Sequence, residues 1–383
     1  MALIEQSGGI DGFVEFMQKR LKLVKSTRSA LMLSYFIGVV IFIESSITSL
    51  IAGAVGRGFV KEYKIPAAKL AFVCDSTSAP ISSLIVLNGW GALLLGLIAT
   101  QIQSGVIEGE AITILLESLM YNFYAMTALL VTFIAIWFNI DIGAMKHSKF
   151  VGTQTKEDKS LNQKAQSMYY MIVPIILMVI FVFVYLYISG DGDILKGSGS
   201  SAIFYTVVTT LVFMFFLYIL KRNMSYKTWG LTAFRGAVKL FPIAIILLFS
   251  FAIGEVTSEL KTGEYLASLA QNNLNVYLLA SVVFLLSSLI SFSTGTSWGT
   301  FSIMIPIAAS MAITLDANIT LVIGAVISGG IFGDHCSPIS DTTIISSIAS
   351  DCEVVEHVNT QLPYALISGV IALLLFFLTS LFF

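Results

Sequence analysis

The sequence predicts an all-α polytopic membrane protein whose helices are interrupted and whose two halves repeat one another. Of its 383 residues, 56% are hydrophobic and 11% charged, and the mean hydropathy is +0.89. The apolar runs are continuous rather than alternating, which favours membrane helices over a β-barrel. Polar segments containing glycine or proline interrupt these runs in both halves. The formal net charge of −2 is uninformative, and no basic patch suggests a nucleic-acid partner. From the apolar composition, the expected surroundings are the lipid bilayer of a cell membrane.

The apolar runs predict the membrane segments, taken in order along the chain. Residues 10–28 mix aromatic and basic side chains, which is typical of an amphipathic helix at a membrane surface; a solvated loop is the alternative. The apolar runs that follow are Ala30–Ala54, Leu84–Gln103, Ile112–Phe138, Tyr169–Ile188, Ala202–Leu220, Lys239–Gly254, Val276–Phe292, Phe301–Ile313, Ile319–Phe332 and Leu362–Phe383.

Loop charges predict the orientation of these segments. The connections 146–168 and 221–239 are basic, which places them in the cytoplasm, because Lys and Arg accumulate on that side. Segments 19–28 and 55–69 are also basic, yet they flank Ala30–Ala54. Both cannot lie inside if that run crosses once, and a re-entrant hairpin would remove the conflict.

The segment Gly333–Thr343 (GDHCSPISDTT) concentrates the polar chemistry of the chain. It lies between two apolar runs, so its carboxylates, imidazole and hydroxyls are expected at membrane depth, where such groups are costly and usually functional. Three glycines at 329, 330 and 333 and Pro338 predict a broken helix. Irregular backbone in a membrane must be buried in protein or line a wet cavity, and its oxygens suit a small cation.

Two motifs of the second half recur in the first half in the same order. Asp75–Ser83 (DSTSAPISS) repeats the acid, hydroxyl and Pro-Ile-Ser order of 334–340, and residues 42–49 (FIESSITS) parallel 292–299 (FSTGTSWG). Paired interrupted segments of this kind indicate inverted repeats around a transport site. We expect a first repeat at 1–140, a linker and connecting helix at 141–200, and a second repeat at 201–383. The segment 4–9 resembles 255–263, so the first repeat is expected to lack its opening helices.

Asp334 and Asp75 are the leading candidates for a site that binds Na+ or H+. A carboxylate can hold Na+ when ionised or H+ when neutral, and burial brings its proton exchange nearer to cellular pH. The alternative is an aspartate that only caps a helix or pairs with a lysine. No resident cofactor is expected, because Na+ and H+ would be the transported species.

The remaining candidates surround these two acids in sequence. Asp341 either binds the ion or caps the next helix through the N–H of Thr343 or Ile344. Glu44 is expected in mid-span, where an unpaired charge is costly. His335 is either a proton relay or a neutral hydrogen-bonded residue. Neutral oxygens are offered by Ser337, Thr342, Thr296, Ser297, Thr77 and Ser78, although membrane hydroxyls often bond only their own helix.

Two other classes of function compete with a transporter. A serine hydrolase within the membrane would use Gly295–Gly299 with His335, which requires a serine–histidine contact. A channel would also use broken helices, although one titratable acid in each repeat fits alternating access better. His335 and Cys336 lack a second ligand cluster, so a transition-metal site is not expected.

These motifs resemble those of the NhaC family of Na+/H+ antiporters. The resemblance is carried by Phe332–Thr343, Ser293–Gly299 and Lys69–Thr77, and it extends over nearly the whole chain. It implies an ion-transporter fold with inverted repeats and Na+/H+ exchange, while some relatives exchange organic acids or amino acids. Two departures are the missing N-terminal helices and Glu44, where relatives often have aspartate. A homodimer is left open.

Overall fold

The structure is a computed structural model that describes residues 2–20, 24–42, 44–150, 166–192, 199–239, 241, 245, 256, 259–260, 265 and 275–383. The regular elements among these residues are helices, with no strand. The chain divides into two compact units, Met1–Lys25 with Gly152–Ile245 and Ser26–Val151 with Ile246–Phe383. Each unit is described by itself below.

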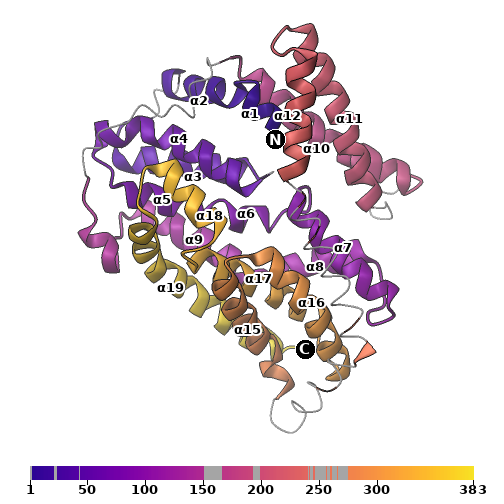
Figure 1. Cartoon of the computed structure of the whole chain (residues 1–383). Helices are drawn as coiled ribbons and strands as arrows, with labels where there is room; N and C mark the ends of the chain where they lie inside the picture. The colour runs from indigo at the N-terminus through magenta and orange to yellow at the C-terminus, as the bar shows by residue number, and fades with distance from the viewer. Residues whose placement is uncertain are drawn as a thin grey trace. The chain divides into compact units, whose positions relative to one another are not determined.

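The first unit is built on a pair of apolar helices. Its helices are α1 (Ala2–Gln6), α2 (Gly9–Arg20), α10 (Tyr169–Ser189), α11 (Gly199–Leu220) and α12 (Tyr226–Lys239). Helix α10 packs along α11, and the Tyr218 hydroxyl donates to the Tyr170 carbonyl at 2.7 Å (Figure 1). The helix expected over residues 10–28 is confirmed for the stretch covered by α2.

The second unit contains both pairs of repeated motifs. Its first part comprises α3 (Thr27–Val40), α4 (Ser45–Tyr63), α5 (Ala67–Ser76), α6 (Ala79–Ser82), α7 (Gly89–Gln103), α8 (Ala111–Met120), α9 (Phe123–Trp137) and the short 3-10 helix η1 (Gly143–His147). Its second part comprises η3 (Val276–Leu278), α15 (Leu279–Thr294), α16 (Ser297–Thr314), α17 (Ile319–Cys336), α18 (Asp341–Ser350) and α19 (Val354–Ser380).

The predicted helix breaks occur at all four repeated motifs. In the first part, α3 is separated from α4 by residues 41–44, and α5 is separated from α6 by residues 77–78. In the second part, α15 is separated from α16 by residues 295–296, and α17 from α18 by residues 337–340. Both leading aspartates therefore lie in the last turn of a helix that ends at a break.

Helix α17 is central to the second unit, where it packs against α15, α16, α19, α8 and α9 (Figure 1). The prediction that its glycines help to break the helix is wrong, because α17 continues through all three. Their role is close packing. A Cβ at Gly329 would lie 2.3 Å from the Phe284 carbonyl oxygen, and one at Gly333 would lie 2.1 Å from that of Ser288. Small residues let α15 approach this closely.

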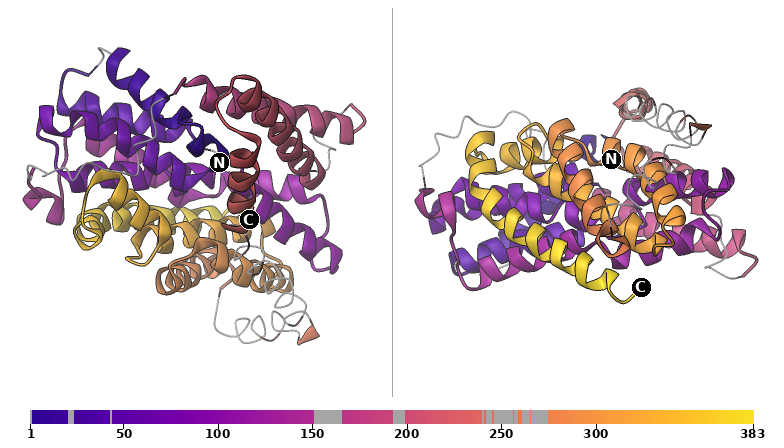
Figure 2. Two further views of the ribbon diagram at one scale, coloured as in Figure 1. Left: turned by 45° about the horizontal axis from the view of Figure 1, so that its top comes forward. Right: turned by 90° about the horizontal axis from the view of Figure 1, so that it is seen from below.

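Six helical segments of the described residues are long and apolar enough to cross a membrane, as expected for a multi-pass membrane protein. The run Ile112–Phe138 corresponds to the segment Ala111–Trp137, which turns at Tyr121 between α8 and α9. The last span begins at Val354 rather than Leu362, and α19 runs past α9, α5, α17 and α15 (yellow in Figure 2). The run Lys239–Gly254, except for positions 239, 241 and 245, and most of 255–275 lie outside the described residues.

The single span expected at Ala30–Ala54 is wrong, because the chain breaks there into α3 and α4. Glu44 is not in the middle of a helix but is the N-cap of α4, where its carboxylate accepts hydrogen bonds from the N–H groups of Ser46 and Ile47 at 3.1 and 2.8 Å. The cap satisfies backbone donors that every helix start leaves open. The basic segments 19–28 and 55–69 conflict in orientation only if Ala30–Ala54 crosses the membrane as one unbroken helix. The break between α3 and α4 removes that assumption.

Candidate functional site

The Asp75 carboxylate is fully buried and is surrounded by hydrogen-bond donors. Its Oδ2 accepts from His357 Nε2 at 3.1 Å and from Gln361 Nε2 at 2.8 Å. The hydroxyls of Thr343 and Ser346 lie 3.4 and 3.3 Å from its two oxygens. Four donors facing one carboxyl group match the acceptor-only form, which is the ionised one.

His335 connects this carboxylate to helix α9. Its Nδ1 lies 2.6 Å from the Tyr124 hydroxyl, and its Nε2 lies 3.3 Å from Ser76 Oγ and 3.9 Å from Asp75 Oδ2. Both His335 and Tyr124 are buried. These contacts are compatible with both a proton relay and a neutral hydrogen-bonded imidazole, since each ring nitrogen has a partner that can donate or accept.

His357, Gln361 and Tyr124 were not expected in the site. His357 and Gln361 lie one turn apart on α19, so both side chains project from one face of the helix toward Asp75. A sequence signal existed, because polar residues recur along this segment at 357, 361, 364 and 368, which is the period of a buried helical stripe. The last span expected from the apolar pattern, Leu362–Phe383, starts only after His357 and Gln361.

Asp334 has a different environment from Asp75, although its side chain is also only 1% exposed. Its Oδ2 accepts a hydrogen bond from Ser297 Oγ at 3.2 Å, whereas its Oδ1 is buried without a hydrogen-bond partner. Ser297 is the first residue of α16, so the second hydroxyl motif and the second acidic motif meet as the repeat pattern suggested. An ionised carboxylate in this position lacks the donors that Asp75 has.

Two further acids interact electrostatically with this position. Asp341 interacts with Asp334, and Glu44 interacts with Asp341. Asp341 is exposed and Glu44 is half-buried, so exposure falls toward Asp334. The expected cap by Asp341 on the N–H of Thr343 or Ile344 is not what the structure shows. Asp341 is instead the first residue of α18, its carboxylate interacts with the Thr342 backbone, and Ser340 is the N-cap.

Most of the candidate hydroxyls are bonded to backbone groups or to another hydroxyl rather than to a candidate carboxylate. Thr77 donates to the Val73 carbonyl at 2.8 Å, Ser78 to that of Asp75 at 2.9 Å, and Ser337 to that of Phe292 at 2.8 Å. Thr296 caps α16 by accepting from the Gly299 N–H at 3.4 Å, and Thr342 Oγ1 lies 3.0 Å from Ser340 Oγ. Of the six, only Ser297 is bonded to a candidate carboxylate among the described contacts.

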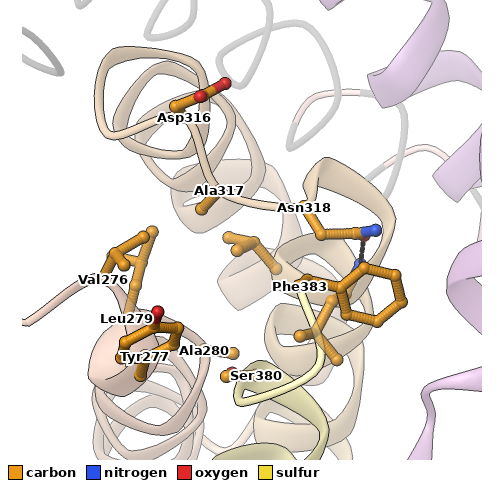
Figure 3. Close-up of a pocket in the computed structure, with 11 residues that line it drawn as sticks. Val276, Tyr277, Leu279, Ala280, Asp316, Ala317, Asn318, Ser380 and Phe383 are labelled. Carbon is orange, nitrogen blue, oxygen red and sulfur yellow. Dashed lines mark hydrogen bonds between the residues drawn. The ribbon is translucent and has the colours of Figure 1, made fainter.

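The carboxylates of Asp75 and Asp334 are enclosed by protein. The pocket drawn in Figure 3 lies elsewhere, between the start of α15, the α16–α17 connection and the end of α19. Its lining includes Asp316, Asn318 and Phe383, and none of the candidate site residues. The structure thus shows the site closed, and ions would reach it through a conformational change.

The contact required of a serine hydrolase does not form between the predicted partners. Ser297 bonds Asp334, and the serine beside His335 Nε2 is Ser76. The other nitrogen of His335 faces the Tyr124 hydroxyl rather than a carboxylate. The orienting acid of the catalytic triad is therefore missing from this imidazole.

Comparison with known proteins agrees with this arrangement. Residues 88–381, about three quarters of the chain, match the family described as "Na+/H+ antiporter family". The chain is 33% identical over 390 residues to an uncharacterised protein of Haemophilus influenzae, covering 95% of this chain and 73% of that protein.

Two shorter similarities involve proteins with named activities. One is an uncharacterised Na+/H+ antiporter of Haemophilus influenzae, 39% identical over 99 residues, which are 25% of this chain and 21% of that protein. The other is a malate-2H+/Na+-lactate antiporter of Bacillus subtilis, 39% identical over 106 residues, 27% of this chain and 21% of that protein. On the match to its family model, the chain belongs to the Na+/H+ antiporter family.

Proposed function

We propose that this chain is a secondary transporter that exchanges Na+ for H+, with Asp334 as the residue at which the two ions compete. The observation that carries the proposal is the buried Asp334 carboxyl group with one oxygen unpartnered. A buried charge without compensation is strongly unfavourable. Asp334 therefore requires either a proton or a bound cation, which is the alternation that antiport needs.

Oxygen atoms around Asp334 suit Na+ better than a soft metal. Ser297 contributes a hydroxyl oxygen, and the break at residues 337–340 brings Ser340 near the carboxylate. Carboxylate and hydroxyl oxygens are the ligands that hard cations prefer. The oxygens of Asp75 already face four hydrogen-bond donors, which leaves fewer lone pairs to bind a cation than Asp334 has. We therefore assign Asp75 to proton transfer rather than to Na+ binding.

The entry of a cation is supported by the graded exposure of three acids. Asp341 at the surface interacts with both half-buried Glu44 and buried Asp334. A line of negative charge raises the local concentration of cations and lowers that of anions. Asp341 and Glu44 thus act in cation access, while Glu44 keeps its structural role as a helix cap.

The architecture that we propose for exchange is two inverted repeats. The repeats would be residues 1–140 and 201–383, joined by 141–200, with alternating access around the two broken helices. Within the antiporter family, the motifs 332–343 and 293–299 favour the NhaC group. A bacterial-type cell membrane, with the basic loops inside, is the proposed location.

An exchanger of an organic acid with Na+ or H+ is the second candidate. The observation favouring it is that the Bacillus subtilis relative is named a malate-2H+/Na+-lactate antiporter. Imidazoles at 335 and 357 could also face an anionic substrate. An amino acid is a further counter-substrate of the same type.

Proteoliposomes separate these candidates. The purified chain should be reconstituted, and lumenal pH followed after external addition of Na+, malate, lactate, arginine or ornithine, each with K+ as the counter-ion control. Alkalinisation of the lumen by Na+ alone supports Na+/H+ exchange. A response that requires an organic substrate assigns the chain to the second candidate, and peptide cleavage or channel-like flux would reject both.

A further inference from the structure

We propose that His357 is a second proton-binding residue of the exchange cycle, with Asp75 as its counter-ion. This proposal rests on the proposed function and deepens it. The repeated motifs lead us to expect two carboxylates, Asp334 and Asp75, as the proton-binding groups. The proposal instead assigns the second proton to His357, which lies outside both motifs.

The hydrogen-bond pattern around His357 carries the proposal. His357 is 0% exposed, and its Nε2 lies 3.1 Å from Asp75 Oδ2. Because the carboxylate accepts, this nitrogen carries the hydrogen, and the neutral ring then has its lone pair on Nδ1. No described residue hydrogen-bonds His357 Nδ1, which is buried. A vacant basic nitrogen beside an ionised carboxylate is poised to take up a proton and form an ion pair.

The groups that face this imidazole are compatible with its carrying a positive charge. From α5, Asp75 forms the ion pair, and Cys74 precedes it. From α17, His335 interacts with both His357 and Asp75, and Asp334 and Cys336 flank it in sequence. Only one of the two imidazoles needs to be charged at a time, because one carboxylate lies between them.

Acidic groups beside the start of α19 complete the surroundings. Glu353 is the N-cap residue of α19 and Glu356 lies in its first turn, with Asp351 just before the helix. Tyr124 from α9 reaches His335 rather than His357. The described partners of Asp75 that can carry a positive charge are the two imidazoles, and Arg57 of α4 interacts electrostatically with the neighbouring Cys74.

Coupling to the cation site follows from the last turn of α17. Asp334 and His335 are consecutive, and they face different partners, Ser297 for the former and Asp75 with Tyr124 for the latter. Gln361 Nε2 donates to Asp75 Oδ2 and, at 2.6 Å, to the His335 carbonyl oxygen. The second of these bonds joins the last turn of α17 to α19. A movement of the α17 terminus that releases a cation from Asp334 therefore also changes the surroundings of His357.

Two measurements test the proposal. The first is the number of protons moved per Na+ in proteoliposomes, obtained from the membrane voltage and pH gradient at which net flux is zero. The wild type should move one more proton per Na+ than His357→Gln or Asp75→Asn, and the double variant should equal each single one. His357→Gln should retain Na+/Na+ exchange, because that exchange needs no net proton movement. Equal stoichiometry in wild type and His357→Gln overturns the proposal, as does loss of Na+/Na+ exchange in that variant.

The second measurement does not depend on exchange activity. The chain has three histidines, so ¹⁵N-histidine NMR of the full protein, with His357→Gln for assignment, resolves each ring. The His357 resonances should convert from the neutral to the doubly protonated form as pH is lowered and should stay neutral over the same range in Asp75→Asn. A ring that remains neutral throughout overturns the proposal. If the wild type shows no Na+-driven proton movement, the proposed function fails, while the NMR titration still decides the role of His357.

Discussion

The Asp75 carboxylate lies 3.1 Å from His357 Nε2, although 282 positions separate the two residues in the sequence. The contact joins a motif of the first half of the chain to the last helix. Gln361, one turn further along α19, adds a hydrogen bond to the same carboxylate and one to the His335 carbonyl. The two broken helices are thereby held together through α19.

Gln361→Leu should destabilise the protein, because it leaves a buried carboxylate oxygen and a buried carbonyl short of a donor. Each unsatisfied group costs about 1–3 kcal/mol. Thermal unfolding in detergent measures the effect. Ser302→Ala is the matched control, since Ser302 is also buried but donates only to the Trp298 carbonyl of its own helix. Equal melting temperatures for the two variants would contradict the bridging role of Gln361.

The glycines of α17 should be required for its packing against α15. Gly333→Ala places a Cβ 2.1 Å from the Ser288 carbonyl oxygen, and overpacking of this kind costs about 1–3 kcal/mol. Gly96→Ala in α7 meets nothing within 4 Å, so it should be neutral or stabilise by about 0.4–1 kcal/mol. The two unfolding temperatures should move in opposite directions or at least differ clearly. Similar shifts would show that α15 and α17 are not packed this closely.

Ser297→Ala should weaken apparent Na+ affinity without abolishing exchange. The variant removes one hydroxyl from Asp334, and a single hydrogen bond or ligand oxygen is worth about 0.5–1.5 kcal/mol, or roughly 2- to 10-fold in affinity. Thr296→Ala is a useful neighbour control, because Thr296 caps α16 and has no described bond to Asp334. Initial rates of exchange against Na+ concentration distinguish the two, and an unchanged affinity in Ser297→Ala would place the cation elsewhere.

Alternating access should appear in the reactivity of Cys336. This thiol is 6% exposed and sits two residues after Asp334. In a Cys74→Ser, Cys352→Ser background, maleimide should label Cys336 slowly at rest and faster when a Na+ gradient drives exchange. A rate that ignores the gradient argues against opening at this break.

The sequence predicts the membrane class, the broken helices and the pairing of the two motifs, because these depend on local composition and repetition. It correctly brings Ser297 to Asp334. It misplaces Glu44, since a helix start inside an apolar run is decided by backbone capping, which hydropathy does not report. It misses His357 and Gln361, because their partner is fixed only by long-range packing. It misinterprets Gly329 and Gly333, because glycine is required at these positions by the close approach of α15, and such a contact is decided by tertiary packing.

The measurement that tests the central claim most directly is lumenal pH in proteoliposomes after external addition of Na+, compared between the wild type and Asp334→Asn over several pH values. In the wild type, Na+ entry should alkalinise the lumen, and half-saturation should require more Na+ as pH falls, because protons compete for the same carboxylate. Asp334→Asn should remain folded and give no response, while Asp341→Asn, at an exposed position, should lose less activity. Normal, pH-dependent exchange by Asp334→Asn would contradict the account and would leave Glu44 as the next candidate.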